Sequence, residues 1–238
     1  MANLKELKTR ISSVKSTQKI TSAMKMVAAS RLKRAQEAAE AARPYAERME
    51  RMISSILENT GATEGGSKLL AGTGAEDNHL VVVVTSDRGL CGGFNSSISR
   101  EARNRIRDLQ AAGKTVKLLC VGRKGRDQLK SEFNDNIVET YEGIGRSGVT
   151  FDEADKVADQ IIGMFDSGEF DVCTLVYNKF VSAITQVVTP QQIIPVEINV
   201  AEETTKDDVA PTSEGPVATY EYEPSEQEIL SEILPGNL

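Results

Sequence analysis

The feature that most constrains this chain is an apolar stripe that repeats every 3.5 residues from Leu4 to Ile56. Alternating steps of three and four residues meet an apolar side chain at thirteen of sixteen positions. Neither proline nor glycine occurs before Pro44, and residues that favour helix dominate. A 3.5-residue period is that of a helix in a left-handed coiled coil. We therefore expect residues 1–58 to form one long coiled-coil helix.

Such a helix needs a mate. Over residues 3–58 it would be roughly 84 Å long at about 1.5 Å per residue, more than one small core can cover. No second stripe of comparable length occurs in the sequence. We expect the mate to come from another chain or from residues outside this sequence. Pro44 removes one backbone donor, so we expect a bend or local break there, with the helix resuming beyond it.

The charge of the chain is unevenly distributed. Residues 1–34 hold nine Lys or Arg and one acidic residue, for a net charge of +8. The other 204 residues hold 19 basic and 34 acidic residues, for a net charge of −15. A basic arm on an acidic body suggests that the arm meets an acidic partner.

The heptad stripe fails at three positions between Gln18 and Lys25. A second apolar line, made by Ile20, Met24 and Val27, lies there about a third of a turn away. Apolar and cationic side chains on several sides suit a segment enclosed by other chains. An ordinary amphipathic helix with solvated lysines is the alternative. A mitochondrial targeting peptide fits less well, because the heptads run through any cleavage point. The candidate contact residues are Lys19, Ile20, Met24, Lys25, Met26, Val27 and Arg31.

The middle of the chain predicts an α/β domain. Residues 59–78 contain five glycines and favour a flexible linker. After them, strands alternate with helices, which is typical of a mainly parallel sheet covered on both faces, here antiparallel at one edge. We expect this Rossmann-like domain over residues 79–200. The expected strands are 80–85, 115–121, 137–140, 171–178 and 183–189, with 192–200 extended, and the expected helices are 95–111, 124–133 and 151–165.

The glycine-rich stretch 86–95 leaves the first strand where a doubly wound sheet would hold a phosphate. It matches neither G-x-G-x-x-G nor G-x-x-x-x-G-K-[ST], so a tight structural turn is favoured, with Asn95 or Ser96 capping the next helix. Within the turn, Asp87 and Arg88 could form an ion pair. The candidate structural-loop residues are Asp87, Arg88, Gly89, Cys91, Gly92 and Gly93.

The sequence argues against several chemistries. Its only histidine, His79, precedes the strand that leads to Cys91, so the two should lie at opposite strand ends, which counts against Cys–His catalysis. Three separated cysteines and no CxxC make a disulfide framework or zinc site improbable. The longest aliphatic run has five residues, against about 20 for a membrane-spanning helix.

The last part of the sequence is acidic. Residues 202–228 hold nine acidic residues and one basic residue. A capping box at 225–228 predicts a short helix that stops at Pro235. We therefore expect an acidic loop followed by a short helix over residues 201–238.

Several stretches together resemble the gamma subunits of bacterial F-type ATP synthases over essentially all 238 residues. The matching stretches are KTRISSV at 8–14, TQKIT at 17–21, AMKMVAAS at 23–30, SDRGLCGG at 86–93, YNKF at 177–180 and residues 225–235. The resemblance implies an N-terminal helix paired antiparallel with a long C-terminal helix, and a Rossmann-like domain at the foot of the shaft. Family members continue past the equivalent of Pro235 into that C-terminal helix, which we expect this chain to lack.

The resemblance also implies a function: a central rotor shaft that couples proton-driven rotation to conformational change in catalytic beta subunits. Its implied partners are the alpha and beta subunits, the epsilon subunit and the membrane c-ring, with no cofactor and no catalysis of its own. Its implied place is the cytoplasmic face of a bacterial inner membrane, or alternatively the matrix face in mitochondria. Two rivals remain, a coiled-coil nucleic-acid binder and a small nucleotide-dependent enzyme.

Overall fold

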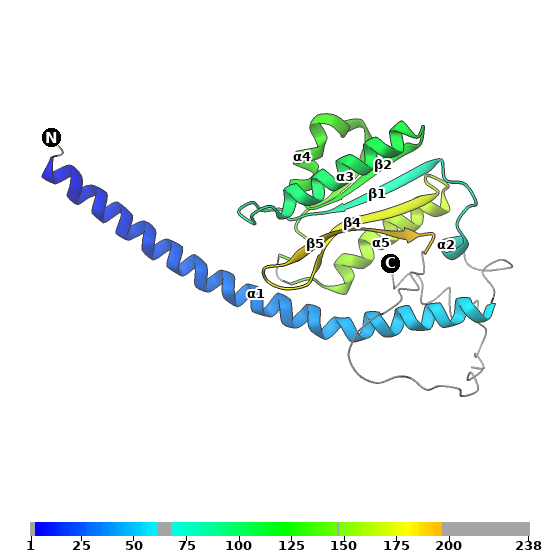
Figure 1. Cartoon of the computed structure of the whole chain (residues 1–238), viewed down its shortest axis with the longest axis horizontal. Coiled ribbons are helices and arrows are strands. Elements are labelled where there is room, and N and C mark those ends of the chain that lie inside the picture. Colours follow the sequence, from blue (N-terminus) through cyan, green and yellow to red (C-terminus); the bar gives the residue numbers. More distant parts are fainter. Residues whose placement is uncertain (1–2, 61–67, 147, 197–238) are drawn as a thin grey trace. The chain divides into compact units, whose positions relative to one another are not determined.

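The computed structural model describes residues 3–60, 68–146 and 148–196. The chain divides into two compact units, Met1–Met52 and Ile53–Leu238. The first is made by α1, a helix of 57 residues that spans Leu4–Thr60 and ends in the second unit (Figure 1). At about 1.5 Å per residue it is roughly 86 Å long. The predicted long helix is confirmed.

The helix continues without a break through Pro44. Of the two expected outcomes, the local break is therefore wrong, whereas α1 does bend along its course (Figure 1). Proline removes one N–H and its ring crowds the carbonyl of residue i−4, but it leaves the other hydrogen bonds of the helix in place. The neighbouring sequence, from Ala35 to Ala46, is rich in alanine and other strong helix formers, which favour continuation.

No side chain of the described part of α1 is buried. The apolar stripe is open to solvent, with exposed fractions of 68% at Leu4, 56% at Ile11 and 63% at Val14. Amphipathic helices are normally stabilised by packing of their apolar side. Of the stripe's side chains whose exposure the structure describes, Leu4 to Met49, none is buried.

The second unit is an α/β fold built on a five-stranded sheet. The strands lie in the order β3-β2-β1-β4-β5, and all neighbours are parallel except β4 and β5. This confirms the predicted mainly parallel sheet with one antiparallel edge. The strands are β1 (Asn78–Val84), β2 (Thr115–Val121), β3 (Ile137–Tyr141), β4 (Val172–Phe180) and β5 (Gln186–Ile194).

Helices cover both faces of the sheet (Figure 1). The alternation along β1 separates two cores: Leu80 and Val82 face one, Val81 and Val83 the other. The first core includes α5 side chains, and the second includes side chains of α3 and α4. The helices of this unit are α2 (Lys68–Ala71), α3 (Phe94–Ala111), α4 (Arg123–Phe133) and α5 (Phe151–Asp166), with a 3₁₀ turn η1 (Asn134–Asn136).

The order in which strands are added to the sheet changes direction at β1, because β2 and β3 lie on one side of it and β4 lies on the other. Doubly wound sheets bind ligands beyond the carboxyl ends of their strands at such a switch point. Here that place belongs to the loop after β1, the predicted structural loop. The predicted acidic loop and short helix at 201–238 lie outside the described residues.

Candidate functional site

The candidate contact segment is a fully exposed stretch of α1. All seven side chains proposed from the sequence lie on the helix surface, in the part of α1 where nothing is buried. At 100° per residue, Ile20, Met24 and Val27 share one side of the helix, with exposed fractions of 61%, 56% and 54%. Met26 points to a different side and is 66% exposed. The segment therefore presents apolar surface in more than one direction.

Positive charge on this segment is not neutralised by any residue that the structure describes. None of Lys19, Lys25 and Arg31 forms an ion pair with any described residue. The ion pair present on α1 lies further along, between Lys33 Nζ and Glu37 Oε1 at 3.7 Å. Because these cations are solvated and unpaired, they are available to acidic groups of another chain.

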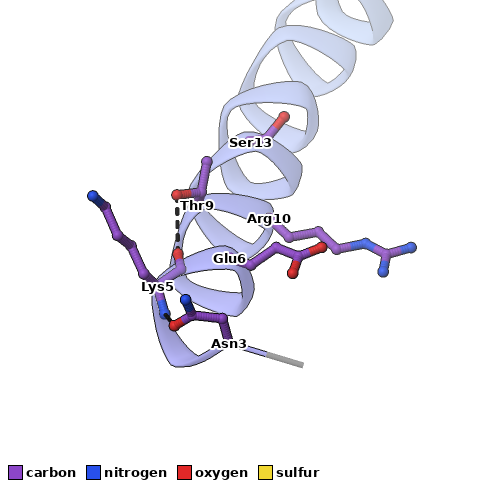
Figure 2. A pocket seen from close by; sticks show the side chains of 6 residues that line it. All are labelled: Asn3, Lys5, Glu6, Thr9, Arg10 and Ser13. Carbon is purple, nitrogen blue, oxygen red and sulfur yellow. Dashed lines mark hydrogen bonds between the residues drawn. The ribbon is translucent and has the colours of Figure 1, made fainter. Parts of the chain in front are cut away.

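The N-terminal end of α1 carries a shallow surface hollow, shown in Figure 2. Its polar groups bond within the helix: Lys5 N–H donates to Asn3 Oδ1 at 3.2 Å, and Thr9 Oγ1 donates to the Lys5 carbonyl at 3.0 Å. The hollow is open and lies on a single helix, so it lacks the enclosing walls of a small-molecule site. It is lined by Asn3, Lys5, Glu6, Thr9, Arg10 and Ser13.

The loop after β1 is fastened to its neighbours by the carboxylate of Asp87. Asp87 Oδ1 accepts a hydrogen bond from the Arg123 N–H at 3.0 Å, and Oδ2 accepts one from the Gly143 N–H at 2.6 Å. Arg123 begins α4 after β2, and Gly143 follows β3. One side chain therefore joins the loops that leave β1, β2 and β3. The Asp87–Arg88 ion pair expected from the sequence is not formed between these described residues.

A second set of hydrogen bonds closes the loop on itself through Asn95. Its Oδ1 accepts from the Ser86 N–H at 3.0 Å, and its Nδ2 lies 3.2 Å from the Arg88 carbonyl and 3.1 Å from Cys91 Sγ. Asn95 is buried inside α3, and the residue at the N-cap is Gly93. The expected capping by Asn95 or Ser96 is therefore wrong, because the Asn95 side chain bonds back to the loop.

The backbone at the end of β1 passes very close to the backbone at the start of α4, next to this loop. Thr85 is buried and its Oγ1 accepts from the Gly125 N–H at 2.8 Å, while Gly122 has φ +100°. A Cβ on Gly122 would lie 2.2 Å from the Thr85 carbonyl oxygen. Only glycine fits both this conformation and this contact. In the sequence, this close approach is marked by Gly122 and Gly125, which lie outside the 86–95 loop and were not among the predicted loop residues.

The arrangement is poorly suited to nucleotide or thiol chemistry. Asp87 places a carboxylate where a doubly wound fold would hold a phosphate, and it takes the backbone N–H at the start of α4. Cys91 lies beyond the carboxyl end of β1, whereas His79 is the second residue of β1 and lies at its amino end. The two side chains are therefore at opposite ends of the strand. His79 is buried within the strand, whereas it was expected to precede the strand, and burial lowers its pKa. Its Nε2 lies 3.0 Å from the Glu76 carbonyl.

The exposed tip of the loop is Arg88–Gly93. Leu90 at its centre has φ +65° and is 98% exposed. The structure thus brings the predicted loop residues together in one turn, whose base is held by the hydrogen bonds of Asp87 and Asn95 and whose tip is exposed. It keeps the helix segment 19–31 and this loop in separate units of the chain.

Two features are absent from the part of the chain that the structure describes. No group of three or more His, Cys, Asp or Glu side chains there is placed to hold a metal ion. No described helix combines the length and apolar character needed to cross a membrane.

Comparison with known proteins decides the family. The family model for ATP synthase matches residues 3–238. The chain is 58% identical over 240 residues to the ATP synthase gamma chain of Rhodospirillum rubrum, covering all of this chain and 79% of that protein. It is 56% identical to the ATP synthase gamma chain of Paramagnetospirillum magneticum, with the same coverage. The chain belongs to the ATP synthase gamma chain family.

A solved structure agrees with this gamma chain assignment. The chain matches a subunit in the cryo-EM structure of the Tetrahymena thermophila mitochondrial ATP synthase central stalk and c-ring, with a TM-score of 0.56 and 33% identity. The match covers 74% of this chain and 72% of that one. The family named from the sequence motifs is therefore confirmed, and so is the α/β fold with a long N-terminal helix.

Proposed function

We propose that this gamma chain is the central shaft of an ATP synthase rotor, coupling proton-driven rotation to conformational change in the catalytic subunits. The observation that carries the proposal is α1, 57 residues long, with an apolar stripe whose described side chains, from Leu4 to Met49, are not buried. A helix of this kind needs other chains along its length. Its family supplies the setting, a central stalk.

The basic and apolar segment 19–31 is the proposed contact with the surrounding ring. A rotor transmits energy only if its contacts with the ring differ in free energy between rotation angles. Tight binding at every angle would shift nothing. Exposed lysines and single apolar side chains, such as Lys25 and Met26, give many weak contacts that can be exchanged as the shaft turns. The proposed contact residues remain Lys19, Ile20, Met24, Lys25, Met26, Val27 and Arg31.

The chain is proposed to be a non-catalytic subunit. At the switch point of its sheet, Asp87 accepts hydrogen bonds from the N–H groups of Arg123 and Gly143, and Asn95 accepts one from the Ser86 N–H, so these backbone donors are already paired within the chain. Chemistry in the complex would then take place in the alpha and beta subunits, with this chain also touching the epsilon subunit and the c-ring. The complex is membrane-associated, and we place this chain on the cytoplasmic face of a bacterial inner membrane as a peripheral subunit.

The proposal divides the chain into four parts by role. Residues 1–58 form the shaft helix, 59–78 the connection, 79–200 the Rossmann-like domain and 201–238 the passage towards the second shaft helix. In support, α1 extends to Thr60 and the sheet runs from Asn78 to Ile194. These boundaries are proposals about function, which deletion or exchange of each part in the assembled complex would test.

Charge reversal on the contact segment tests the function directly. In the assembled ATP synthase in inverted membrane vesicles, Lys19→Glu, Lys25→Glu and Arg31→Glu are combined. Exposed charge contacts contribute roughly 0.2–1 kcal/mol each, so three reversals change the angle-dependent energy by about 1–3 kcal/mol or more. We expect ATP-driven proton pumping to fall severalfold relative to ATP hydrolysis, measured by quenching of a pH-sensitive dye and by phosphate release.

The matched control reverses three exposed cations of the α/β unit, Arg100, Lys156 and Lys179, which changes the net charge by the same amount. We expect that control to retain the pumping-to-hydrolysis ratio of the unmodified complex. Unchanged coupling in the α1 triple variant would disprove the contact assignment. Pumping that persists in a complex without this chain would disprove the shaft function itself.

A further inference from the structure

The segment that follows α1 in the chain, residues 68–78, is held against the α/β domain at several points. Leu69 packs on the core formed with α5. Gly72 has φ +74°, and a Cβ there would lie 3.3 Å from the ring of Pro195. At its far end, the carbonyl of Asp77 accepts from the Thr115 N–H at 2.8 Å. The segment thus contacts the domain before β1 begins.

The carboxylate of Asp171 is the centre of this attachment. Its Oδ1 accepts a hydrogen bond from Thr73 Oγ1 at 2.7 Å. Its Oδ2 accepts from the Asn78 N–H at 3.0 Å and from Asn78 Nδ2 at 3.2 Å. Asp171 comes directly before β4, so these bonds link positions 98 and 93 residues apart in the sequence. An ionised carboxylate that accepts three donors makes stronger bonds than a neutral acceptor does.

The backbone at this point is already paired, so the side chain adds to an existing contact. The Asp171 N–H donates to the Asn78 carbonyl at 2.8 Å, which continues the pairing of β1 with β4. Thr73 lies five residues before Asn78, outside the sheet. The hydrogen bond between Asp171 and Thr73 therefore attaches a residue outside the sheet to the domain, on the side of β1 that leads back along the chain to α1.

We infer that Asp171 is a positioning residue that fixes the segment after α1 to the α/β domain through Thr73 and Asn78, so that twist passes between domain and shaft. The inference rests on the proposed rotor function. The covalent path from α1 to the sheet runs through residues 61–78. Torque carried along that path reaches the apolar contact of Leu69 first and then the hydrogen bond between Thr73 and Asp171. The Leu69 contact is non-directional, whereas the bond from Thr73 Oγ1 to Asp171 Oδ1 is short and charge-assisted and therefore fixes the direction of the segment.

The inference predicts that weakening this fastening loosens the connection without unfolding the domain. Thr73→Val removes the hydroxyl donor and keeps the shape, and Asp171→Asn removes the charge. Losing one hydrogen bond to a charged group lowers the closed-to-open ratio of the contact by roughly tenfold or more. In the assembled complex, we expect hydrogen exchange at the Asn78 amide, which donates to Asp171 Oδ2, to rise by about that factor in both variants.

The mechanical readout is coupling. We expect the ratio of ATP-driven proton pumping to ATP hydrolysis to fall in both variants, and the angular fluctuations of a bead on the α/β domain to widen. Thr73→Ser retains the hydroxyl and should restore all three measurements. Asp159→Asn, an exposed acid on α5, is the matched control and should change none of them.

Each outcome is decisive. Faster exchange together with lower coupling and rescue by serine supports the inference. Faster exchange with unchanged coupling and unchanged bead fluctuations disproves the mechanical role, and unchanged exchange disproves the fastening. These failures differ from failure of the rotor function, in which the complex containing the unmodified chain would show no dependence of pumping on this chain.

Discussion

Single side chains join distant segments of this domain by accepting hydrogen bonds from backbone N–H groups. Asp87 accepts from Arg123 and Gly143, which lie 36 and 56 residues further along the chain, and Thr85 accepts from Gly125, which lies 40 residues further along. The sequence identified the 86–93 stretch as a structural loop, but it could not supply these partners, because they meet only after the sheet forms. A local partner for Asp87, namely Arg88, was the natural expectation and is wrong for that reason.

Gly122→Ala should destabilise the full chain strongly. Its φ of +100° is unfavourable for alanine, and the new Cβ would meet the Thr85 carbonyl at 2.2 Å. We expect a loss of at least about 1–3 kcal/mol in the free energy of unfolding. Gly163→Ala is the matched control, since its Cβ would meet nothing within 4 Å and it lies inside α5. Alanine there should stabilise by about 0.5–1 kcal/mol. Urea unfolding measures both, and equal effects would contradict the argument from this close approach.

The hydrogen bond from Thr73 is the main reason that the pKa of Asp171 is lowered, and the bonds from Asn78 add to it. Because the folded pKa lies below the unfolded value of about 3.9, ionised Asp171 stabilises the fold above that pH. This contribution is lost as the pH falls below about 3.9 through the folded pKa. We expect the difference in unfolding free energy between the unmodified chain and Asp171→Asn to be constant near neutral pH. It should shrink in acid, and a difference independent of pH would refute this role.

At the scale of whole elements, sequence pattern succeeded where the pattern is periodic. The order of strands and helices from β1 to β5 follows from alternating apolar runs and glycine boundaries, and most predicted ends fall within about three residues of the observed ones. The largest exception is β5, which runs unbroken through Pro190 from Gln186 to Ile194, where a strand at 183–189 and a separate extended stretch at 192–200 were expected. A smaller difference at the start of β1 comes from tertiary context. His79 joins β1 because the strand pairs with β2 and β4 from its first residues, although a histidine beside Asn78 gave no apolar signal.

The continuity of α1 through Pro44 leads to a test of that element. An interior proline costs a helix about 3 kcal/mol relative to alanine. Pro44→Ala should therefore slow hydrogen exchange of the amides near residues 40–48 in the full chain, because it restores one donor and removes a clash. Ala39→Gly should speed exchange nearby, at a cost of about 1 kcal/mol. Faster exchange in Pro44→Ala would show that the proline is compensated in a way that the helix alone does not reveal.

At the scale of the molecule, the two units differ in what they do with apolar side chains. The α/β unit buries its own in two cores, one on each face of the sheet. The unit made by α1 buries none in its described part. The sequence made this division visible through the heptad period, which needs a partner along its whole length. The identity of the partner came from the family and not from the pattern.

The full chain on its own should neither bind nor hydrolyse ATP. At the switch-point edge of its sheet, the Arg123 N–H is taken by the Asp87 carboxylate and the Ser86 N–H by Asn95 Oδ1, so these backbone donors are not free for a phosphate. Isothermal titration with Mg-ATP and a phosphate-release assay check this. Turnover that disappears in Asp87→Asn or Cys91→Ser would show that the loop is an active site after all.

The open stripe from Leu4 to Val14 also bears on how a cell must handle this polypeptide. Each newly made copy exposes, until it is assembled, the kind of surface that chaperones bind and that drives precipitation. Surplus copies are therefore expected to be short-lived, so that supply has to match that of the other components. Assembly of the complex would then require that this chain be synthesised in proportion to its partner subunits.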